Sequence, residues 1–237
     1  MKYELIDKTK DYLVINKPAG LLTHGAPHIK EPSLVDQLIK DFPEIIGVGE
    51  DPERPGIMHR LDKMASGILV IAKNMDSFDS LKKQFKERTV KKEYSALVFG
   101  KLEKDEDDIN FPIKRSSKGF KMAALPATKD GKDNKDGRRA MTHFWVNKRF
   151  FHYTLINVAI KTGRTHQIRV HMSAYGHPLV GDDVYGTKKT RIKNKKINLG
   201  RIFLVARKLE FQNLKGETVK YEIDLPTELK EFLDTIK

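Results

Sequence analysis

The sequence predicts an α+β fold built on a mixed, mostly antiparallel sheet. Two observations lead to this class: the predicted strands outnumber the predicted helices, and several strands follow one another with no helix between them. A parallel sheet would need a crossover segment, usually a helix, between successive strands. Because no internal repeat and no clear linker interrupts the 237 residues, we expect one domain spanning residues 1–237.

Seven segments are predicted to be strands because they are short, apolar and rich in β-branched or aromatic residues. Tyr12 to Lys17 is an apolar run that ends at Pro18, and Gly67 to Lys73 has the composition of a buried strand. Phe151 to Ile160 shows apolar alternation. The other strands are expected near residues 90–99, 139–146, 202–211 and 219–225.

Four segments have the signals of helices. A Ser-x-x-Asp pattern resembling a capping box begins the first helix, over residues 33–42. The second, over 76–88, has an apolar face and a basic outer face. The third begins near Thr165, with Gly176 at the position that ends many helices, and Pro226 starts the fourth.

Three polar segments are notable for their charge. The acidic segment Glu103 to Asp108 and the polar segment Lys129 to Arg139 have no apolar anchor, so we expect solvated loops there. Lys188 to Arg201 carries seven basic residues and no acidic one. Such a segment is either a solvated lysine-rich face or a surface that binds phosphate.

The overall composition predicts a soluble protein that binds nucleic acid. The chain has 45 Lys and Arg against 32 Asp and Glu, a formal net charge of +13, which attracts polyanions. It has no cysteine, which excludes disulfides, cysteine zinc sites and thiol nucleophiles. The N-terminus lacks signal-peptide features and no apolar run approaches the ~20 residues of a membrane span. We expect a cytoplasmic protein that does not enter membranes.

Several common sites are excluded by their patterns. The glycines near residue 48 precede Glu50-Asp51-Pro52, which cannot open the helix of a dinucleotide-binding loop. The segment 161–164 is not a Walker A loop. His166 and His171 are five residues apart and would lie on different helix faces, so no metal site is expected.

Asp62 is the most informative acidic residue. An Asp beside a Lys on a loop is usually a surface ion pair of little energetic value. Asp62, however, lies between the apolar Leu61 and the short turn 65–67, which leads into a buried strand. A carboxylate at such a position is partly desolvated and needs a cationic partner to stay ionised. Arginine suits that role because its planar fork holds a carboxylate and keeps its proton.

The ordered motifs around this residue resemble those of the RluA-type RNA pseudouridine synthases. The matching segments are His59-Arg60-Leu61-Asp62-Lys63-Met64-Ala65-Ser66-Gly67, Asn16-Lys17-Pro18-Ala19-Gly20-Leu21, Lys92-Glu93-Tyr94, Lys161 through His171, His177-Pro178-Leu179 and Gly181-Asp182. The resemblance covers nearly the whole chain. The resemblance implies the pseudouridine synthase fold, in which helices and loops flank the sheet around a central RNA-binding cleft. It also implies an isomerase without metal or organic cofactor, and no separate S4-type RNA-binding domain.

The resemblance assigns three catalytic roles. Asp62 would attack or assist at the ribose C1′ while the glycosidic bond to N1 breaks. Tyr94 would stack on the target base and help remove the C5 proton, although a strand Tyr is more often packing. Arg169 would form the ion pair that keeps Asp62 ionised, whereas without the motif it would be a surface arginine.

Five further residues are expected to contact the substrate. Ile168 and Leu204 match positions that wall the uracil pocket, a role compatible with plain core packing. The target base must leave its stack, and the resemblance implies that Arg60, the arginine of the His-Arg-Leu-Asp motif, fills the vacated space. His59, from the motif that contains Asp62, and Arg164, from the motif over residues 161–171, complete the expected set. The basic segments 82–92 and 188–201 would hold phosphates.

Two positions depart from the family pattern. Ala65 replaces the usual Thr before Ser-Gly and loses a hydroxyl that could brace the turn, and Val205 stands where many members have His. Neither touches the proposed catalytic residues, so we expect altered support and retained activity.

We therefore expect a monomeric enzyme that converts uridine to pseudouridine in ribosomal or transfer RNA. Arg54-Pro55-Gly56-Ile57 favours large-subunit ribosomal RNA, whereas the missing S4 domain favours tRNA or dual specificity. One alternative is a non-catalytic RNA-binding assembly factor, which predicts damage at the positions of Asp62, Tyr94 or Arg169. Another is a hydrolase using Ser66, but a Gly-x-Ser-x-Gly elbow is missing.

Overall fold

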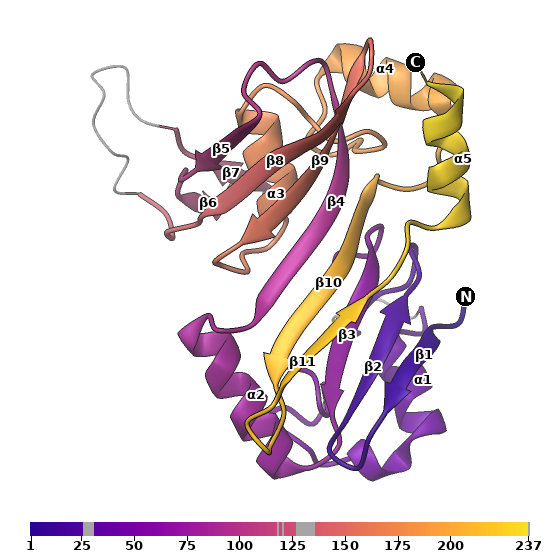
Figure 1. Cartoon of the computed structure of the whole chain (residues 1–237), viewed down its shortest axis with the longest axis vertical. Coiled ribbons are helices and arrows are strands. Elements are labelled where there is room, and N and C mark those ends of the chain that lie inside the picture. The colour runs from indigo at the N-terminus through magenta and orange to yellow at the C-terminus, as the bar shows by residue number, and fades with distance from the viewer. Residues whose placement is uncertain (26–30, 118, 120, 127–135, 237) are drawn as a thin grey trace. The chain divides into compact units, whose positions relative to one another are not determined.

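The structure is a computed structural model that describes residues 1–25, 31–117, 119, 121–126 and 136–236 (Figure 1). It divides into two compact units. The first unit comprises residues 1–92 and 206–224, and the second comprises residues 93–205 and 225–237. Two strands, β4 (Lys91–Phe99) and β10 (Leu204–Gln212), contribute residues to both units.

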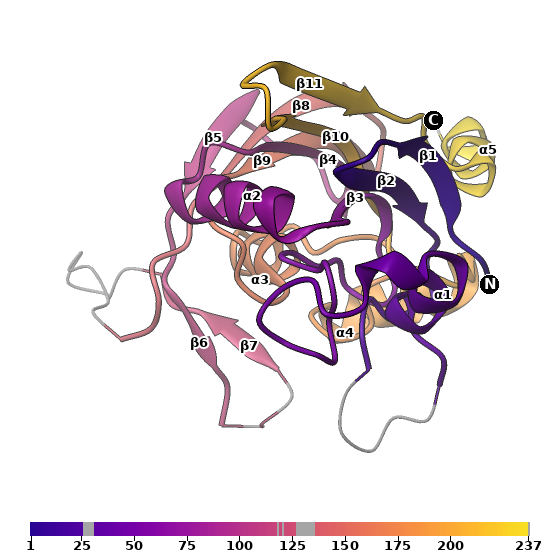
Figure 2. The same ribbon diagram turned by 90° about the horizontal axis from the view of Figure 1, so that it is seen from below.

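The first unit is a sheet with helices on one side (Figure 2). Its strands lie in the order β1 (Glu4–Lys8), β2 (Tyr12–Lys17), β3 (Ser66–Ala72), β10 and β11 (Thr218–Glu222). Strand β2 is antiparallel to β3, with Lys17 opposite Gly67. The helices are α1 (Leu34–Asp41), the short 3-10 helix η1 (Pro43–Ile45) and α2 (Met75–Glu87).

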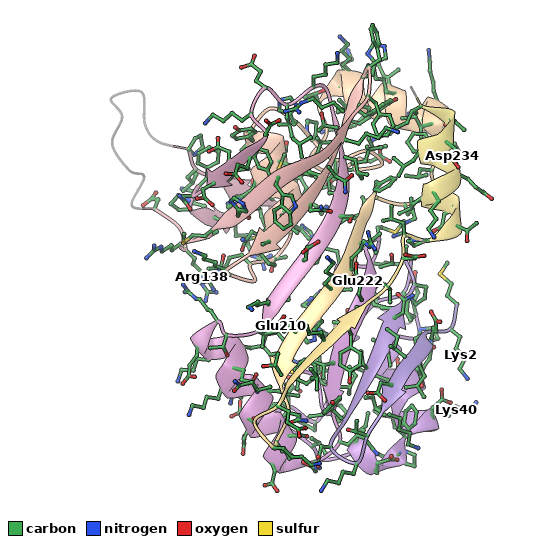
Figure 3. The ribbon with its side chains drawn as sticks, in the orientation of Figure 1. Lys2, Lys40, Arg138, Glu210, Glu222 and Asp234 are labelled. Carbon is green, nitrogen blue, oxygen red and sulfur yellow. The ribbon has the colours of Figure 1, made fainter. Side chains whose placement is uncertain are left out.

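The first unit is held together by an apolar cluster between strand and helix. Val14 and Val70, which are fully buried, pack with Leu81 of α2 and with Phe211 of β10. The outer surface of β10 carries charge instead. Glu210 of β10 accepts a hydrogen bond from Lys91 at 2.7 Å. It lies opposite Lys220 of β11, the strand that also carries Glu222 (Figure 3).

The second unit contains a fully antiparallel four-stranded sheet. Its order is β4, β9 (Tyr153–Ile160), β8 (Thr142–Arg149) and β5 (Glu106–Ile109). A separate hairpin pairs β6 (Ile113–Arg115) with β7 (Met122–Ala124). Helix α3 (Gln167–Ala174) packs against β7 and β8, and α4 (Lys188–Ile197) and α5 (Thr227–Thr235) complete the unit.

The fold class expected from sequence is confirmed, and so are most of its elements. The capping box is present: the backbone N–H and hydroxyl of Ser33 donate to the Asp36 carboxylate, and Asp36 N–H donates back to the Ser33 hydroxyl. Gly176 follows the cap of α3 with φ of +93°. The strand expected over 139–146 begins three residues later, at Thr142.

One loop expectation was wrong. Residues 106–109, part of the acidic segment, form β5 because β8 offers its backbone hydrogen bonds along that edge. The exposed side of β5 keeps its charged side chains in water, so its polarity and its strand conformation are compatible. Most of the loop expected at 129–139, residues 129–135, lies outside the described residues.

Two elements carried no clear local signal. Strand β1 is short and mostly polar, and its partner β2 determines it. The basic segment 188–201 begins with helix α4, whose N-cap Thr187 accepts a hydrogen bond from the Thr190 N–H. Across the described ranges, no helix is long and apolar enough to span a membrane.

Candidate active site

Asp62 lies in a tight loop immediately before β3. Its carbonyl accepts a hydrogen bond from the Ala65 N–H at 3.1 Å, which closes a turn, and the chain enters β3 at Ser66. Leu61 and Ala65 on either side are buried, at 5% and 1% exposure. The turn forms with Ala65 in place of the usual Thr, so the departure from the family pattern leaves the backbone turn in place.

Thr23 holds the residue before Asp62. The buried Thr23 hydroxyl donates to the Leu61 carbonyl at 2.9 Å and accepts from the Leu61 N–H at 3.3 Å. Both backbone groups of Leu61 are therefore satisfied by one side chain. This pair of hydrogen bonds fixes the direction in which the chain enters Asp62.

Lys17 holds the residue after Asp62. It is fully buried, which is rare for a lysine. Its ammonium donates to the carbonyls of Pro18 at 2.9 Å, Leu21 at 2.8 Å and Lys63 at 3.3 Å. The Lys63 carbonyl also accepts from the Gly20 N–H at 2.7 Å. Three carbonyls match the three N–H donors of an ammonium, which is how the charge is tolerated inside the protein.

His59 anchors the start of the loop to β3. Its Nε2 accepts the Val70 N–H at 3.1 Å, which places the ring proton on Nδ1, and its ring stacks on Phe85 with centroids 4.5 Å apart. Burial, reinforced by the neighbouring charge of Lys92, lowers the pKa of His59 to about 3. Burial also lowers the pKa of Lys92 to about 8. At neutral pH His59 is therefore a neutral acceptor.

Arg60 and Lys63 point to the solvent-exposed side of the same loop. Arg60 Nη1 donates to His24 Nε2 at 2.9 Å, and Lys63 pairs with Glu31 at 2.5 Å. Arg60 is exposed, as a side chain that enters RNA must be. In the first unit, then, the structure places His59, Arg60 and Asp62 on one loop with three different environments.

Arg169, in the second unit, forms a buried ion pair with Asp182. Nε and Nη2 donate to the two carboxylate oxygens at 2.7 and 3.0 Å, and the residues are 6% and 0% exposed. One of these oxygens also accepts the N–H groups of Val184 and Tyr185, each at 3.0 Å. Such a bidentate, fully hydrogen-bonded pair fixes the guanidinium in place.

The described partner of Arg169 was not anticipated from sequence. Asp182 stands in a Gly-Asp pair that matches the family pattern, and that pair was the only signal. Gly181 has φ of +79° and a Cβ there would approach the Arg201 carbonyl oxygen to 1.9 Å, so only glycine fits before Asp182. Asp182 takes two of the five guanidinium N–H donors. The ion pair of Arg169 with Asp62 stays a prediction.

Polar side chains also fix the start of α3. The Gln167 amide is buried: its nitrogen donates to the Met141 carbonyl at 2.9 Å, and its oxygen accepts the Thr162 hydroxyl at 2.7 Å and the Arg164 N–H at 3.1 Å. His166, which precedes it, has a left-handed backbone with φ of +55°. The helix that carries Ile168 and Arg169 is thus held at its first turn.

The remaining expected residues have mixed environments. Tyr94 is 7% exposed on β4, opposite Val158 of β9, and Leu204, at 4%, begins β10. Ile168, also 4% exposed, lies on α3. Arg164 Nε donates to the Arg139 carbonyl at 3.3 Å. Tyr94, Ile168, Arg169, Leu204 and Arg164 thus all belong to the second unit.

Among the residues that the structure describes, no group of three or more His, Cys, Asp or Glu side chains is arranged to hold an ion. The polar groups brought together around Asp62 are hydroxyl, ammonium and backbone donors. Thr23 and Lys17 bind the backbone carbonyls of Leu61 and Lys63, so they fix the chain on either side of Asp62.

Comparisons with known proteins agree with this arrangement. A family model described as RNA pseudouridylate synthase matches residues 11–174, which include the Asp62 loop and all of α3. An RNA pseudouridine synthase of Bacillus subtilis is 37% identical over 238 residues, covering 100% of this chain and 74% of the relative. One from Aquifex aeolicus is 41% identical and covers 95% and 70%.

Further relatives include a protein described as ribosomal large subunit pseudouridine synthase D of Nitrosomonas europaea. It is 37% identical over 95% of this chain, and the chain spans 62% of that relative. Among solved structures, human RNA pseudouridylate synthase domain containing 1 matches with a TM-score of 0.74 at 28% identity, covering 95% of this chain and 84% of the other. Human RNA pseudouridylate synthase domain containing 4 has a TM-score of 0.78 at 24% identity, covering 99% and 94%, which is a likeness of fold.

Proposed function

The chain belongs to the RNA pseudouridylate synthase family, and from that premise we propose that it isomerises specific uridines of large-subunit ribosomal RNA with Asp62 as the catalytic carboxylate. It is an RNA pseudouridine synthase, an isomerase. The observation that carries the residue assignment is the loop of Asp62, which Thr23 and Lys17 hold on both sides of the carboxylate.

In the proposed reaction, the Asp62 carboxylate attacks the ribose C1′, or assists there, while the bond from C1′ to N1 breaks. The electron pair of that bond stays with uracil, which turns within the pocket and forms a new bond from C5 to C1′. Where Asp62 has bonded to C1′, that bond breaks as the C5 bond forms, and the carboxylate leaves with its electron pair. The C5 proton then leaves and N1 takes up a proton. Product and substrate have the same atoms, so the reaction needs neither an oxidant nor a second substrate.

Two residues are proposed to act with Asp62. Tyr94 stacks on the target base and helps to remove the C5 proton, and Arg169 keeps the Asp62 carboxylate ionised. The rigid pairing of Arg169 with Asp182 supports this role, because a fixed guanidinium loses little conformational entropy when it binds a further anion. Ile168 and Leu204 wall the base.

RNA binding is proposed to use the basic surfaces of both units. On α4 the side chains of Lys188, Lys189, Lys195 and Lys196 are exposed, which suits electrostatic contacts with phosphates. Arg60 is proposed to fill the space that the target base vacates when it leaves the helical stack. Phosphate contacts hold the RNA in register and do not select the uridine.

The choice of large-subunit ribosomal RNA rests on the activity for which several relatives are named. Proteins 36 to 39% identical, from Nitrosomonas, Neisseria and Pseudomonas, are described as ribosomal large subunit pseudouridine synthases. The chain spans 54 to 62% of their length. A tRNA or dual-specificity enzyme is the second candidate. We also propose that it acts as a monomer, which light scattering tests.

The test of the catalytic role measures tritium release from RNA labelled at uridine C5. We expect turnover by the wild type and none by Asp62→Asn, which keeps the size of the side chain and removes its charge. Asp79→Asn, an exposed position on α2, is the matched control and should keep full activity. Equal release by wild type and Asp62→Asn, with RNA binding retained in both, would remove Asp62 from the mechanism.

The target is tested separately by mapping pseudouridines in large-subunit ribosomal RNA and in tRNA after incubation with the protein, and in cells that lack the gene. New sites in the ribosomal RNA alone support the proposal. Sites only in tRNA would replace the substrate and leave the catalytic assignment intact.

A further inference from the structure

The first unit contains a pocket whose apolar wall has no role in the proposed reaction. Its volume is about 250 Å³, and its walls come from the chain before Asp62 and from the first half of α2. The lining residues are His24, Glu50, Asp51, Arg54, Ile57, Met58, His59, Arg60, Phe78 and Lys82. Arg60 at its edge is only two residues from Asp62, so one RNA strand can contact both.

The charges around the pocket leave one cation available. Asp51 binds Arg54, with Oδ2 accepting from Nε at 2.7 Å and from Nη2 at 2.6 Å, and Glu50 pairs with Lys82. Both carboxylates of the lining are thereby neutralised by their own partners. Among the residues that the structure describes, Arg60 has no carboxylate partner.

His24 holds Arg60 without neutralising it. Burial, and the nearby charges of Arg60 and Arg54, lower the pKa of His24, so its ring is neutral at pH 7. His24 Nδ1 donates to the Gly25 carbonyl at 2.9 Å, and Nε2 accepts one N–H of Arg60 at 2.9 Å. Four of the five guanidinium N–H donors are left for an anion. A fixed, uncompensated guanidinium is a typical phosphate contact.

The floor of the pocket is apolar and rigid. Phe78 and Ile57 are 5% and 9% exposed, and Met58 is half-buried against the cluster that Phe78 forms with Val48 and Ala72. Gly56 fixes the chain beside this floor: its N–H donates to the Val48 carbonyl at 2.7 Å. An apolar surface beside a single cation matches a nucleobase and its phosphate.

We propose that this pocket binds a nucleotide of the substrate RNA next to the target uridine, with its base against Ile57, Met58 and Phe78 and its phosphate on Arg60. The inference rests on the proposed function for the identity of the ligand. It gives the enzyme a contact with sequence around the target, because the pocket accepts a base of limited size and shape. Phosphate contacts on α4 do not supply that discrimination.

The test uses a fluorescein-labelled oligouridylate of twelve nucleotides that carries 4-thiouridine for photo-crosslinking. We expect crosslinks to the peptides that contain Met58 and Phe78, and about tenfold weaker binding by Met58→Trp, which fills the pocket, because a stacked base contributes about 1 to 3 kcal/mol. A competitor of the same length without bases should displace the probe poorly. Equally good displacement would show that the site reads phosphate alone and would overturn the proposal.

Control variants keep the test interpretable. Lys215→Ala removes an exposed cation of the same unit outside the pocket and outside both basic segments, and should leave the advantage of the base-containing strand unchanged. If Met58→Trp does not fold by circular dichroism, Met58→Gln takes its place, because it keeps the size of this half-buried side chain and makes the wall of the pocket polar. No crosslink at the pocket together with normal tritium release would overturn this inference alone. Pocket crosslinks without any tritium release would instead overturn the proposed reaction.

Discussion

Replacing Lys17 by methionine tests whether a buried ammonium holds the Asp62 loop. Methionine has nearly the same length and no N–H donor, so the change removes three hydrogen bonds to carbonyl oxygens. The Lys63 carbonyl keeps its bond from the Gly20 N–H, whereas the carbonyls of Pro18 and Leu21 lose their ammonium donor.

The expected loss follows from those two carbonyls. Each buried acceptor left without a donor costs about 1 to 3 kcal/mol. Part of this loss is offset because the variant no longer buries a charge. We expect the free energy of unfolding to fall by about 2 to 4 kcal/mol, which for a chain of this length lowers Tm by about 5 to 15 °C.

Activity should fall as well, because the carbonyl that Lys17 binds directly follows Asp62. A loop displaced by about 1 Å can cost up to about a hundredfold in rate. We expect kcat for tritium release to fall at least about tenfold in Lys17→Met, with KM little changed, since Lys17 is buried and does not contact RNA.

Urea unfolding followed by circular dichroism measures the stability term. Lys63→Met is the control: it removes a lysine of the same loop that is 40% exposed and pairs only with an exposed Glu31, so it should cost less than about 1 kcal/mol. If Lys17→Met and Lys63→Met are equally stable, the ammonium does not hold the loop and the reasoning fails.

Three further changes follow from the packing. His59 has a pKa of about 3 in the folded chain, so as pH falls below about 6.5 the unfolded chain binds this proton first. The free energy of unfolding should therefore drop by about 1.4 kcal/mol between pH 8 and pH 5.5. His59→Gln should remove that dependence in urea titrations, and an unchanged pH profile would contradict the reasoning. Gly67→Ala should lower the free energy of unfolding by about 3 kcal/mol or more, because φ is +125° and the new Cβ would lie 2.3 Å from the Ala206 carbonyl oxygen. Gly47→Ala, with open space around it, should lower it by about 1 kcal/mol. Equal losses would refute the steric argument. Asp182→Asn removes the charge of the buried carboxylate that accepts two N–H groups of Arg169 and should cost about 3 to 5 kcal/mol in the same assay, and a loss under about 1 kcal/mol would show that the pair is not needed.

Local sequence determined the elements whose signals are local. The capping box at Ser33 starts α1 because its two hydrogen bonds involve residues three apart, and the β-branched run after Ser66 forms β3 because it has few alternatives in a buried position. The motif that contains Asp62 was likewise readable, since spacing along the chain defines it.

Tertiary structure alone decided which groups support those residues. A lysine before a proline gives no sign that it will be fully buried, and nothing near Arg169 in sequence identifies Asp182, thirteen residues away, as its partner. The segment 106–109, whose first three residues are acidic, forms a strand only because β8 lies beside it. In each case the deciding energy comes from a hydrogen bond or a desolvated charge between segments distant in sequence, and such contacts exist only once the chain has folded.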